Sequence, residues 1–257
     1  MTPILVFDIE TIPDVEGLRH VWELGAEASD EAVVELAYQR RRQATGGDFL
    51  PLHLHRVVAI SCALREGNAI KVWSLGSSKD GEGELVKRFF DGIDKYTPQL
   101  VSWNGSGFDL PVLHYRALLH GVVASRYWDL GEDDRDFKWN NYISRFHARH
   151  TDLMDLLAGY QNRAFAPLDE IAQLAGLPGK LGMDGSKVWG AWREGKIEAI
   201  RNYCETDVAN TYLLFQRFQR MRGILTPEAY EREVALFRQW LGEQKAAHWG
   251  EFAAAWK

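Results

Sequence analysis

The hydrophobic positions of this chain fall into short runs between polar turns, and into longer stretches where apolar residues recur every three or four positions. The first pattern is typical of buried strands, and the second is typical of helices that pack on a sheet. Strands are predicted at 4–7, 57–64, 69–75 and up to Trp103, and helices at 29–43, 82–96, 112–119, from Thr151 and at 197–215.

The order of these elements predicts the topology. The tight connection at 66–68 joins the second and third strands into a hairpin, so the first three strands are antiparallel. A helix, a fourth strand and further helices follow, which matches a ribonuclease H-like α/β fold with a mixed central sheet flanked by helices. Such a fold needs a fifth strand before the last helices, but residues 122–150 are irregular and do not show its position.

We expect one ribonuclease H-like domain over residues 1–222, with a helical insertion at about 14–54 and a helical extension at 223–257. Gly223 and Pro227 mark the break before the extension. The tryptophans of this tail recur near helical spacing, which favours docking on the core over the alternative of an interface with a partner.

The first predicted strand is followed directly by Asp8 and Glu10. Side chains two positions apart in an extended chain point to the same side, so both carboxylates would project together at the strand's end. Their charges repel each other, and burial removes their hydration. A fold tolerates this arrangement when a divalent cation lies between the two groups, or when one of them stays protonated.

Two further acidic elements occur later in the chain. Asp109 lies between a predicted strand and a helix, where it is either a helix cap or a metal ligand. Tyr203 and Asp207 are four residues apart and therefore share one side of a long helix. A carboxylate on an apolar helix face is costly unless it is paired or metal-bound. A structural hydrogen bond between Tyr203 and Asp207 is the alternative explanation.

The order of the three elements resembles the DEDD exonuclease superfamily in its tyrosine-bearing branch. More narrowly, it resembles the stand-alone predicted 3′–5′ exonucleases related to the exonuclease domain of family B DNA polymerases. The resemblance covers roughly residues 4–220. The first motif is matched by Asp8 and Glu10, the second by Asn104, Phe108 and Asp109, and the third by Tyr203 and Asp207.

The resemblance implies a metal-dependent 3′–5′ exonuclease that releases nucleoside 5′-monophosphates from the 3′ end of a single strand, with DNA favoured over RNA. Two divalent ions, Mg²⁺ or Mn²⁺, would be held by Asp8, Glu10, Asp109 and Asp207. Tyr203 would orient the attacking water, because a phenol with a pKa of about 10 is a poor general base. The implied substrate-binding residues are Ile9, Thr11, Trp103, Asn104, Phe108 and Lys187.

Two alternatives keep the same fold. An RNA-trimming exonuclease would differ in its contacts to the 2′-hydroxyl. A nucleic-acid-binding scaffold without activity would keep the fold and lose the chemistry. Competent residue types at all four carboxylate positions and at Tyr203 favour an active enzyme.

Two segments are candidates for additional contacts with nucleic acid. Residues 125–150 interleave aromatic and basic side chains, which suits stacking on a single strand but also ordinary loop packing. The loop at 180–187 contains glycines and two lysines, and this suits a flap over a bound strand or a plain surface loop. His147, His150 and His248 are expected to be structural.

Composition limits the remaining choices. The net charge of −6 argues against a protein that coats long nucleic acid, although an enzyme that grips a few terminal nucleotides needs only a local positive strip. No apolar stretch approaches the about 20 residues of a membrane span, and no signal segment precedes the first strand, so a cytoplasmic protein is expected. Cys62 and Cys204 indicate neither a disulfide framework nor a zinc cluster, and Cys204 is expected to serve packing. The oligomeric state stays open.

Overall fold

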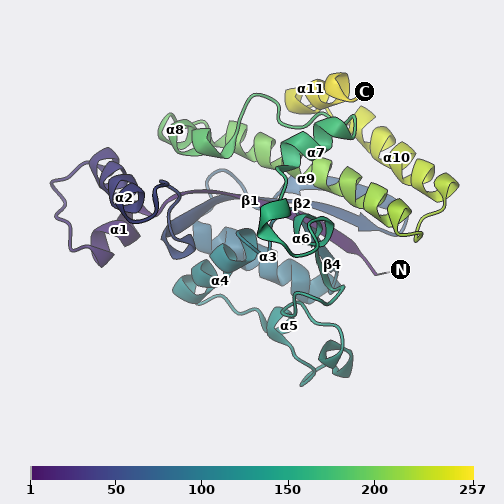
Figure 1. Cartoon of the computed structure of the whole chain (residues 1–257), viewed down its shortest axis with the longest axis horizontal. Helices are drawn as coiled ribbons and strands as arrows, with labels where there is room; N and C mark the ends of the chain where they lie inside the picture. The colour runs from purple at the N-terminus through teal and green to yellow at the C-terminus, as the bar shows by residue number, and fades with distance from the viewer. Residues whose placement is uncertain (1) are drawn as a thin grey trace.

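A five-stranded mixed sheet forms the centre of the computed structural model, which describes residues 2–257 (Figure 1). Its strand order is β3-β2-β1-β4-β5. The first three strands are antiparallel, and β4 and β5 run parallel to β1. This is the predicted ribonuclease H-like arrangement. The strands are β1 (Ile4–Pro13), β2 (His55–Glu66), β3 (Ala69–Ser74), β4 (Gln99–Ser102) and β5 (His150–Asp152).

The first strand is longer than the sequence indicated. The apolar run predicted a strand that ends before Asp8, but β1 continues to Pro13 and pairs with β2 throughout. The expectation that Asp8 and Glu10 lie beyond the strand is therefore wrong. Their polarity hid the continuation of the strand, because the partner strand supplies hydrogen bonds whatever the side chain is. Pairing with β4 stops after Val6, so both carboxylates lie where β1 has a free edge.

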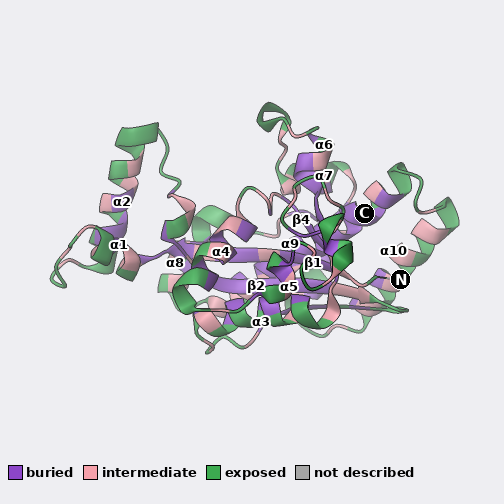
Figure 2. Cartoon of the chain, turned by 90° about the horizontal axis from the view of Figure 1, so that it is seen from below, coloured by how far each residue is buried: buried purple, intermediate pink, exposed green. Residues whose placement is uncertain are grey.

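Alternation along β1 decides which way its side chains point. Leu5, Phe7 and Ile9 belong to the hydrophobic cluster under α3 and α4, whereas Val6 belongs to the cluster under α9. Asp8 and Glu10 share the side of Val6 and so face α9. Figure 2 shows the buried residues concentrated along the sheet and on the helix faces that cover it.

Two helical layers cover the sheet. The first layer contains α3 (Glu82–Tyr96), α4 (Asp109–His120) and α5 (Ser125–Trp128). The second contains α6 (Leu153–Leu157), α7 (Leu168–Leu174), α9 (Ile197–Met221), α10 (Pro227–Gly242) and α11 (Ala247–Ala255). The predicted helices at 82–96 and 197–215 are confirmed, and the second extends to Met221.

The C-terminal helices pack on the second layer. Trp249 and Phe252 of α11 are buried in the same cluster as Phe237 of α10 and Tyr212 of α9. Rings of the four residues lie close together, with Tyr212 stacked on Phe237 at 5.6 Å between centroids. The predicted docking of the tail on the core is therefore confirmed.

The region between β4 and α6 contains the strand that the sequence did not reveal. β5 has only three residues, and all are buried although each is polar. Such a strand shows no apolar run. The helix predicted from Thr151 begins instead at Leu153, with Asp152 accepting backbone N–H groups at its start.

Residues between β1 and β2 form α1 (Val15–Val21) and α2 (Asp30–Thr45), which enclose a small hydrophobic cluster of their own. The helix predicted at 29–43 is present as α2, and the Ser29 side chain caps it. The remaining elements are α8 (Val188–Arg193) and four short 3₁₀ turns at Leu52–Leu54, Arg135–Lys138, Asn162–Ala164 and Gly185–Lys187. Among residues 2–257, no helix combines the length and the hydropathy needed to cross a membrane.

Candidate active site

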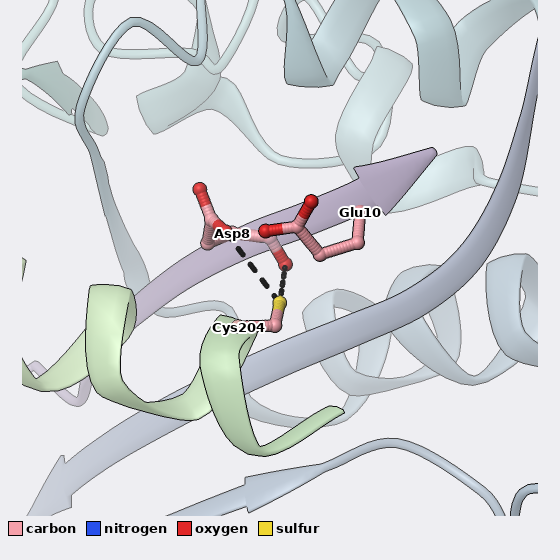
Figure 3. Close-up of side chains that lie close together, drawn as sticks. All are labelled: Asp8, Glu10 and Cys204. Atoms are coloured by element: carbon pink, nitrogen blue, oxygen red, sulfur yellow. Dashed lines mark hydrogen bonds between the residues drawn. The ribbon is translucent and has the colours of Figure 1, made fainter. Parts of the chain in front are cut away.

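Asp8 and Glu10 project from β1 toward α9, where Cys204 meets them (Figure 3). One ligand atom of each of the three side chains lies within 4.8 Å of the others. The Cys204 thiol donates to the backbone oxygen of Asp8 at 3.3 Å and to its carboxylate at 3.5 Å. A thiol is a poor ligand for Mg²⁺, so Cys204 packs at the site and supports Asp8 rather than adding an oxygen.

Asp109 reaches the same place from the other side of the sheet. It is the first residue of α4, and its carboxylate accepts the backbone N–H of Ile9 at 3.1 Å. This amide lies between Asp8 and Glu10, on the edge that β4 leaves free. The side chain of Asp109 thus replaces a strand partner and is held beside both acids.

The loop that precedes Asp109 is fixed by Asp152. The two carboxylate oxygens of Asp152 accept the backbone N–H groups of Asn104 at 3.0 Å and Ser106 at 2.8 Å. Asn104 adopts a left-handed backbone conformation with φ of 67°. A Cβ atom at Gly105 would lie 2.3 Å from the hydroxyl of Ser102, so only glycine fits there.

Helix α9 contributes Tyr203 and Asp207. Both side chains are buried, and Oδ1 of Asp207 has no hydrogen-bond partner among residues 2–257. The charge of Asp207 raises the pKa of Asp8 and of Glu10, so the carboxylates of α9 and β1 lie within electrostatic reach of each other. The four acidic side chains of the three predicted motifs therefore converge in space.

Burial and mutual repulsion raise the pKa values of all four carboxyl groups. Desolvation, followed by repulsion from neighbouring acids, raises the pKa of Asp8 and Glu10 well above their usual range. Desolvation also raises the pKa of Asp109 to about 7, although backbone N–H groups act in the opposite direction. For Asp207, desolvation raises the pKa to about 7 against the lowering effects of Tyr203 and Lys180.

The pKa of Tyr203 is also raised, first by burial and then by the charges of Asp207, Glu10 and Asp8. Its phenol therefore stays protonated at neutral pH and is available as a hydrogen-bond donor. It is not a base under these conditions.

The donor set fits divalent cations. Mg²⁺ and Mn²⁺ prefer carboxylate oxygens, and this cluster presents four carboxylates without an arginine among them. A carboxylate oxygen of Asp207 is buried and unpartnered, which is costly unless a cation or a proton satisfies it. Protons fill that role when their affinity is raised, as the pKa values show. Cations would displace them.

A cavity of about 480 Å³ opens beside Glu10. Three of the predicted substrate-binding residues line it, namely Ile9, Thr11 and Phe108. Thr11 is held by a hydrogen bond of 2.9 Å to His55. The segment before β2 also contributes Tyr38, Asp48, Phe49 and Leu50, and the opposite wall is formed by Gly185, Ser186 and Trp189.

Phe49 was not among the predicted site residues. Its side chain is 59% exposed at the cavity, and its ring lies 5.7 Å from that of Phe108 and 5.2 Å from that of His55. The sequence signal was the apolar Phe49-Leu50 pair that ends the insertion, but spacing alone does not reveal that an insertion folds back to the first strand.

The other three predicted substrate-binding residues lie elsewhere. Trp103 is buried and donates to the backbone oxygen of Ala166 at 3.1 Å. Asn104 lines a different cavity of about 520 Å³ on the other side of its loop. The ammonium of Lys187 bonds within its own loop, to Gly182 at 3.1 Å and to Asp184 at 3.1 Å.

Lys180 is the lysine of this loop that faces the carboxylates. Its ammonium lies 5.6 Å from the centre of the Tyr203 ring, and its charge lowers the pKa of Glu10 and of Asp207. The sequence named the loop from Lys180 to Lys187 and selected the lysine at its other end. Which end turns inward depends on Gly179, whose backbone is bonded to Asn210 of α9.

The aromatic and basic segment 125–150 divides between packing and exposure. Tyr127, Phe137 and Tyr142 are buried and stack in the first layer. Trp139 and Phe146 are 77% and 76% exposed. Both readings of the segment therefore apply to part of it.

The three histidines singled out by the sequence have structural partners. His150 bonds to Ser102 at 2.8 Å, His147 accepts the backbone N–H of Asn141 at 3.0 Å, and His248 pairs with Glu205 at 3.0 Å.

Comparison with known proteins adds relatives to this geometry. A DNA polymerase of Archaeoglobus fulgidus is 24% identical over 136 residues, which is 52% of this chain and 17% of the polymerase. The family B DNA polymerase of the archaeon Pyrobaculum calidifontis aligns with 82% of this chain and 24% of its own, at a TM-score of 0.49 and 18% identity. The chain thus spans a small part of either polymerase.

A family model describes predicted 3′–5′ exonucleases related to the exonuclease domain of PolB, and it matches residues 47–256. The match contains Asp109, Tyr203 and Asp207, and it begins after α2, so Asp8 and Glu10 precede it. Since most of the chain is covered, this protein belongs to the family of predicted 3′–5′ exonucleases related to the exonuclease domain of PolB.

Proposed function

We propose that this protein is a metal-dependent 3′–5′ exonuclease that removes nucleoside 5′-monophosphates from the 3′ end of single-stranded nucleic acid, preferably DNA. The observation that carries the proposal is the convergence of Asp8, Glu10, Asp109 and Asp207, with raised pKa values, beside a protonated Tyr203. Family membership supports the reaction class.

Asp8, Glu10, Asp109 and Asp207 would hold two divalent ions, Mg²⁺ or Mn²⁺. When bound, such ions lower the pKa of a water molecule and stabilise the charge on the departing 3′ oxygen. The residues of the chain position the other groups. Tyr203 donates a hydrogen bond that orients the attacking water, and Lys180 balances part of the acidic charge from the outer side of Tyr203.

The cavity beside Glu10 is the proposed site of the terminal nucleotide. Its volume of about 480 Å³ falls within the usual range for small-molecule sites. The rings of Phe49 and Phe108 offer faces for a base, because aromatic side chains stack on any base without reading its identity. Ile9 and Thr11 line the strand side of this cavity, next to the carboxylates.

The test is degradation of a single-stranded oligonucleotide labelled at its 5′ end, in Mg²⁺ and in Mn²⁺. A ladder that shortens from the 3′ end, with nucleoside 5′-monophosphate as product, is the expected result. Asp8→Asn should abolish cutting while the protein stays folded, and Arg232→Ala, on the exposed face of α10, should cut like the wild type.

A matched RNA strand of the same sequence measures the sugar preference. Faster loss of the DNA strand is expected, and faster loss of the RNA strand would contradict that part of the proposal. Wild-type protein that binds the strand and never cuts it with either metal would overturn the enzyme assignment.

A further inference from the structure

A second cavity, of about 610 Å³, lies between α9, α10 and the ends of α7 and α11 (Figure 1). It is separate from the carboxylate site, since none of its lining residues belongs to that site. Its walls include hydrophobic residues such as Leu177 and Leu213, but its rim is basic. The basic members are Arg217 and Arg220 of α9, Arg238 of α10 and Lys257.

The three arginines of this cavity lack acidic partners. Among residues 2–257, no ion pair and no side-chain hydrogen bond involves Arg217, Arg220 or Arg238, while Arg65 nearby is paired with Glu233 at 2.8 Å. Glu231 is the acidic member of the lining. In a chain with a net charge of −6, such a group of unpaired guanidinium groups creates a local positive potential that attracts anions.

Aromatic rings support two of the guanidinium groups. Arg238 lies 3.8 Å from the centre of the Trp256 ring, and Arg220 lies 5.1 Å from that of Tyr230. Stacking on a ring restricts the side chain and leaves its N–H fork free, and that fork matches the geometry of a phosphate group. Basic groups alternating with aromatic faces are the combination that binds single-stranded nucleic acid.

Two helices connect the basic cavity to the carboxylate site. Asp207 and Arg217 lie on α9 ten residues apart, which is about 15 Å along a helix axis. Helix α7 runs between the two places, because Asp169 at its start raises the pKa of Asp207 and Leu177 just beyond its end lines the cavity. A strand whose 3′ end lies at the carboxylates can therefore extend over α7 to the arginines.

We infer that this cavity binds backbone phosphates of the nucleic acid substrate on the 5′ side of the nucleotide that is removed. The inference rests on the proposed function for the identity of the ligand. It adds an anchoring site that holds longer strands, and it predicts that affinity depends on strand length. Strands too short to reach from the carboxylates to Arg217 gain nothing from it.

The decisive experiment compares Arg217→Ala/Arg238→Ala with the matched control Arg232→Ala/Lys245→Ala. Both variants lose two positive charges from exposed side chains, but the control residues lie outside the cavity. Binding of a labelled DNA strand of about 20 nucleotides is measured in EDTA over a range of salt concentrations. EDTA prevents a metal-dependent nuclease from cutting.

The arginine variant should bind about ten-fold more weakly, and the slope of log affinity against log salt should fall by about 1.4 for two lost phosphate contacts. The control should match the wild type, and Arg217→Lys/Arg238→Lys should retain most of the slope. With Mg²⁺, the arginine variant should cut a strand of about three nucleotides at the wild-type rate.

Equal affinity and equal slope for the arginine variant and the wild type would overturn the inference. So would a variant that loses stabilisation by inorganic phosphate in thermal melting but keeps its affinity for the strand, since the cavity would then serve a small anion. Failure of the exonuclease proposal is seen separately, as absence of cutting by the wild type.

Discussion

At the scale of single residues, the candidate site is a set of acids that the fold keeps close at a cost in stability. Each of the four carboxyl groups holds its proton more tightly than it would in water. The metal-free protein therefore carries a pH-dependent penalty. A bound cation would remove it.

We predict that Asp207→Asn stabilises the metal-free protein at high pH. The pKa of Asp207 is raised from 3.8 to about 7 on folding, so the wild type loses stability as pH rises through that interval. An amide cannot ionise, and the variant should avoid this loss. Thermal melting in EDTA should show a gap in Tm that is negligible near pH 4 and largest above about pH 7. A gap that shrinks with rising pH would contradict the prediction.

Tyr203→Phe tests the orienting role of the phenol. We expect kcat to fall about 100-fold, because loss of one positioning hydrogen bond misaligns the attacking water. The affinity for Mg²⁺ and the Tm should stay close to the wild-type values, since no carboxylate is removed. Single-turnover cutting of a short strand across a Mg²⁺ titration separates the two quantities. Unchanged kcat would remove Tyr203 from the reaction.

The sequence identified the residues that carry charge into the site better than those that surround it. Asp8, Glu10, Asp109 and Asp207 were found because acids on apolar elements are conspicuous. Cys204 looked like simple packing, although its thiol touches Asp8 at the site. Lys180 was missed because the fold of its loop depends on contacts with α9 that no local pattern encodes.

At the scale of elements, the loop before α4 depends on a residue from another strand. Asp152 at the end of β5 accepts N–H groups from that loop and from the first turn of α6. Sequence patterns could not show this link, because β5 is a three-residue polar strand. The position of Asp109 follows from it.

Asp152→Ala should lower both stability and activity. It removes a helix cap, which typically contributes about 1 kcal/mol, and it leaves the N–H groups of Asn104 and Ser106 without acceptors. Release of the loop should lower kcat/KM below the wild-type value at temperatures where the variant is still folded. Asp152→Asn keeps one acceptor oxygen and should lie between the two. Equal kcat/KM for all three proteins would show that Asp109 is positioned without this loop.

The segment between β1 and β2 should contribute to substrate binding through Phe49. We predict that Phe49→Ala raises KM for a single strand about ten-fold, as expected for loss of one base-stacking face worth roughly 1–3 kcal/mol. Phe49→Tyr keeps the face and should restore KM. Because the ring is 59% exposed, the Tm should change little. Steady-state cutting of the labelled strand measures these effects, and an unchanged KM for the alanine variant would place the base elsewhere.

At the scale of the whole molecule, the order of elements along the chain was sufficient to predict the sheet topology and the two helical layers. The lengths of β1 and β5 were not, since strand ends are set by pairing with neighbours rather than by local composition. The same limit applies to the basic cavity. Its arginines are scattered over α9 and α10, and only packing of the tail brings Arg238 and Trp256 beside Arg217.

The free edge of β1 has a consequence for thermal behaviour. Asp109 reaches Ile9 around this edge from the layer of α4, whereas Asp207 approaches from the layer of α9 on the opposite face. The catalytic assembly thus spans both layers and has no strand beneath it to hold them in register. Warming should separate the layers slightly before the core melts, and activity should then disappear reversibly several degrees below the main calorimetric transition.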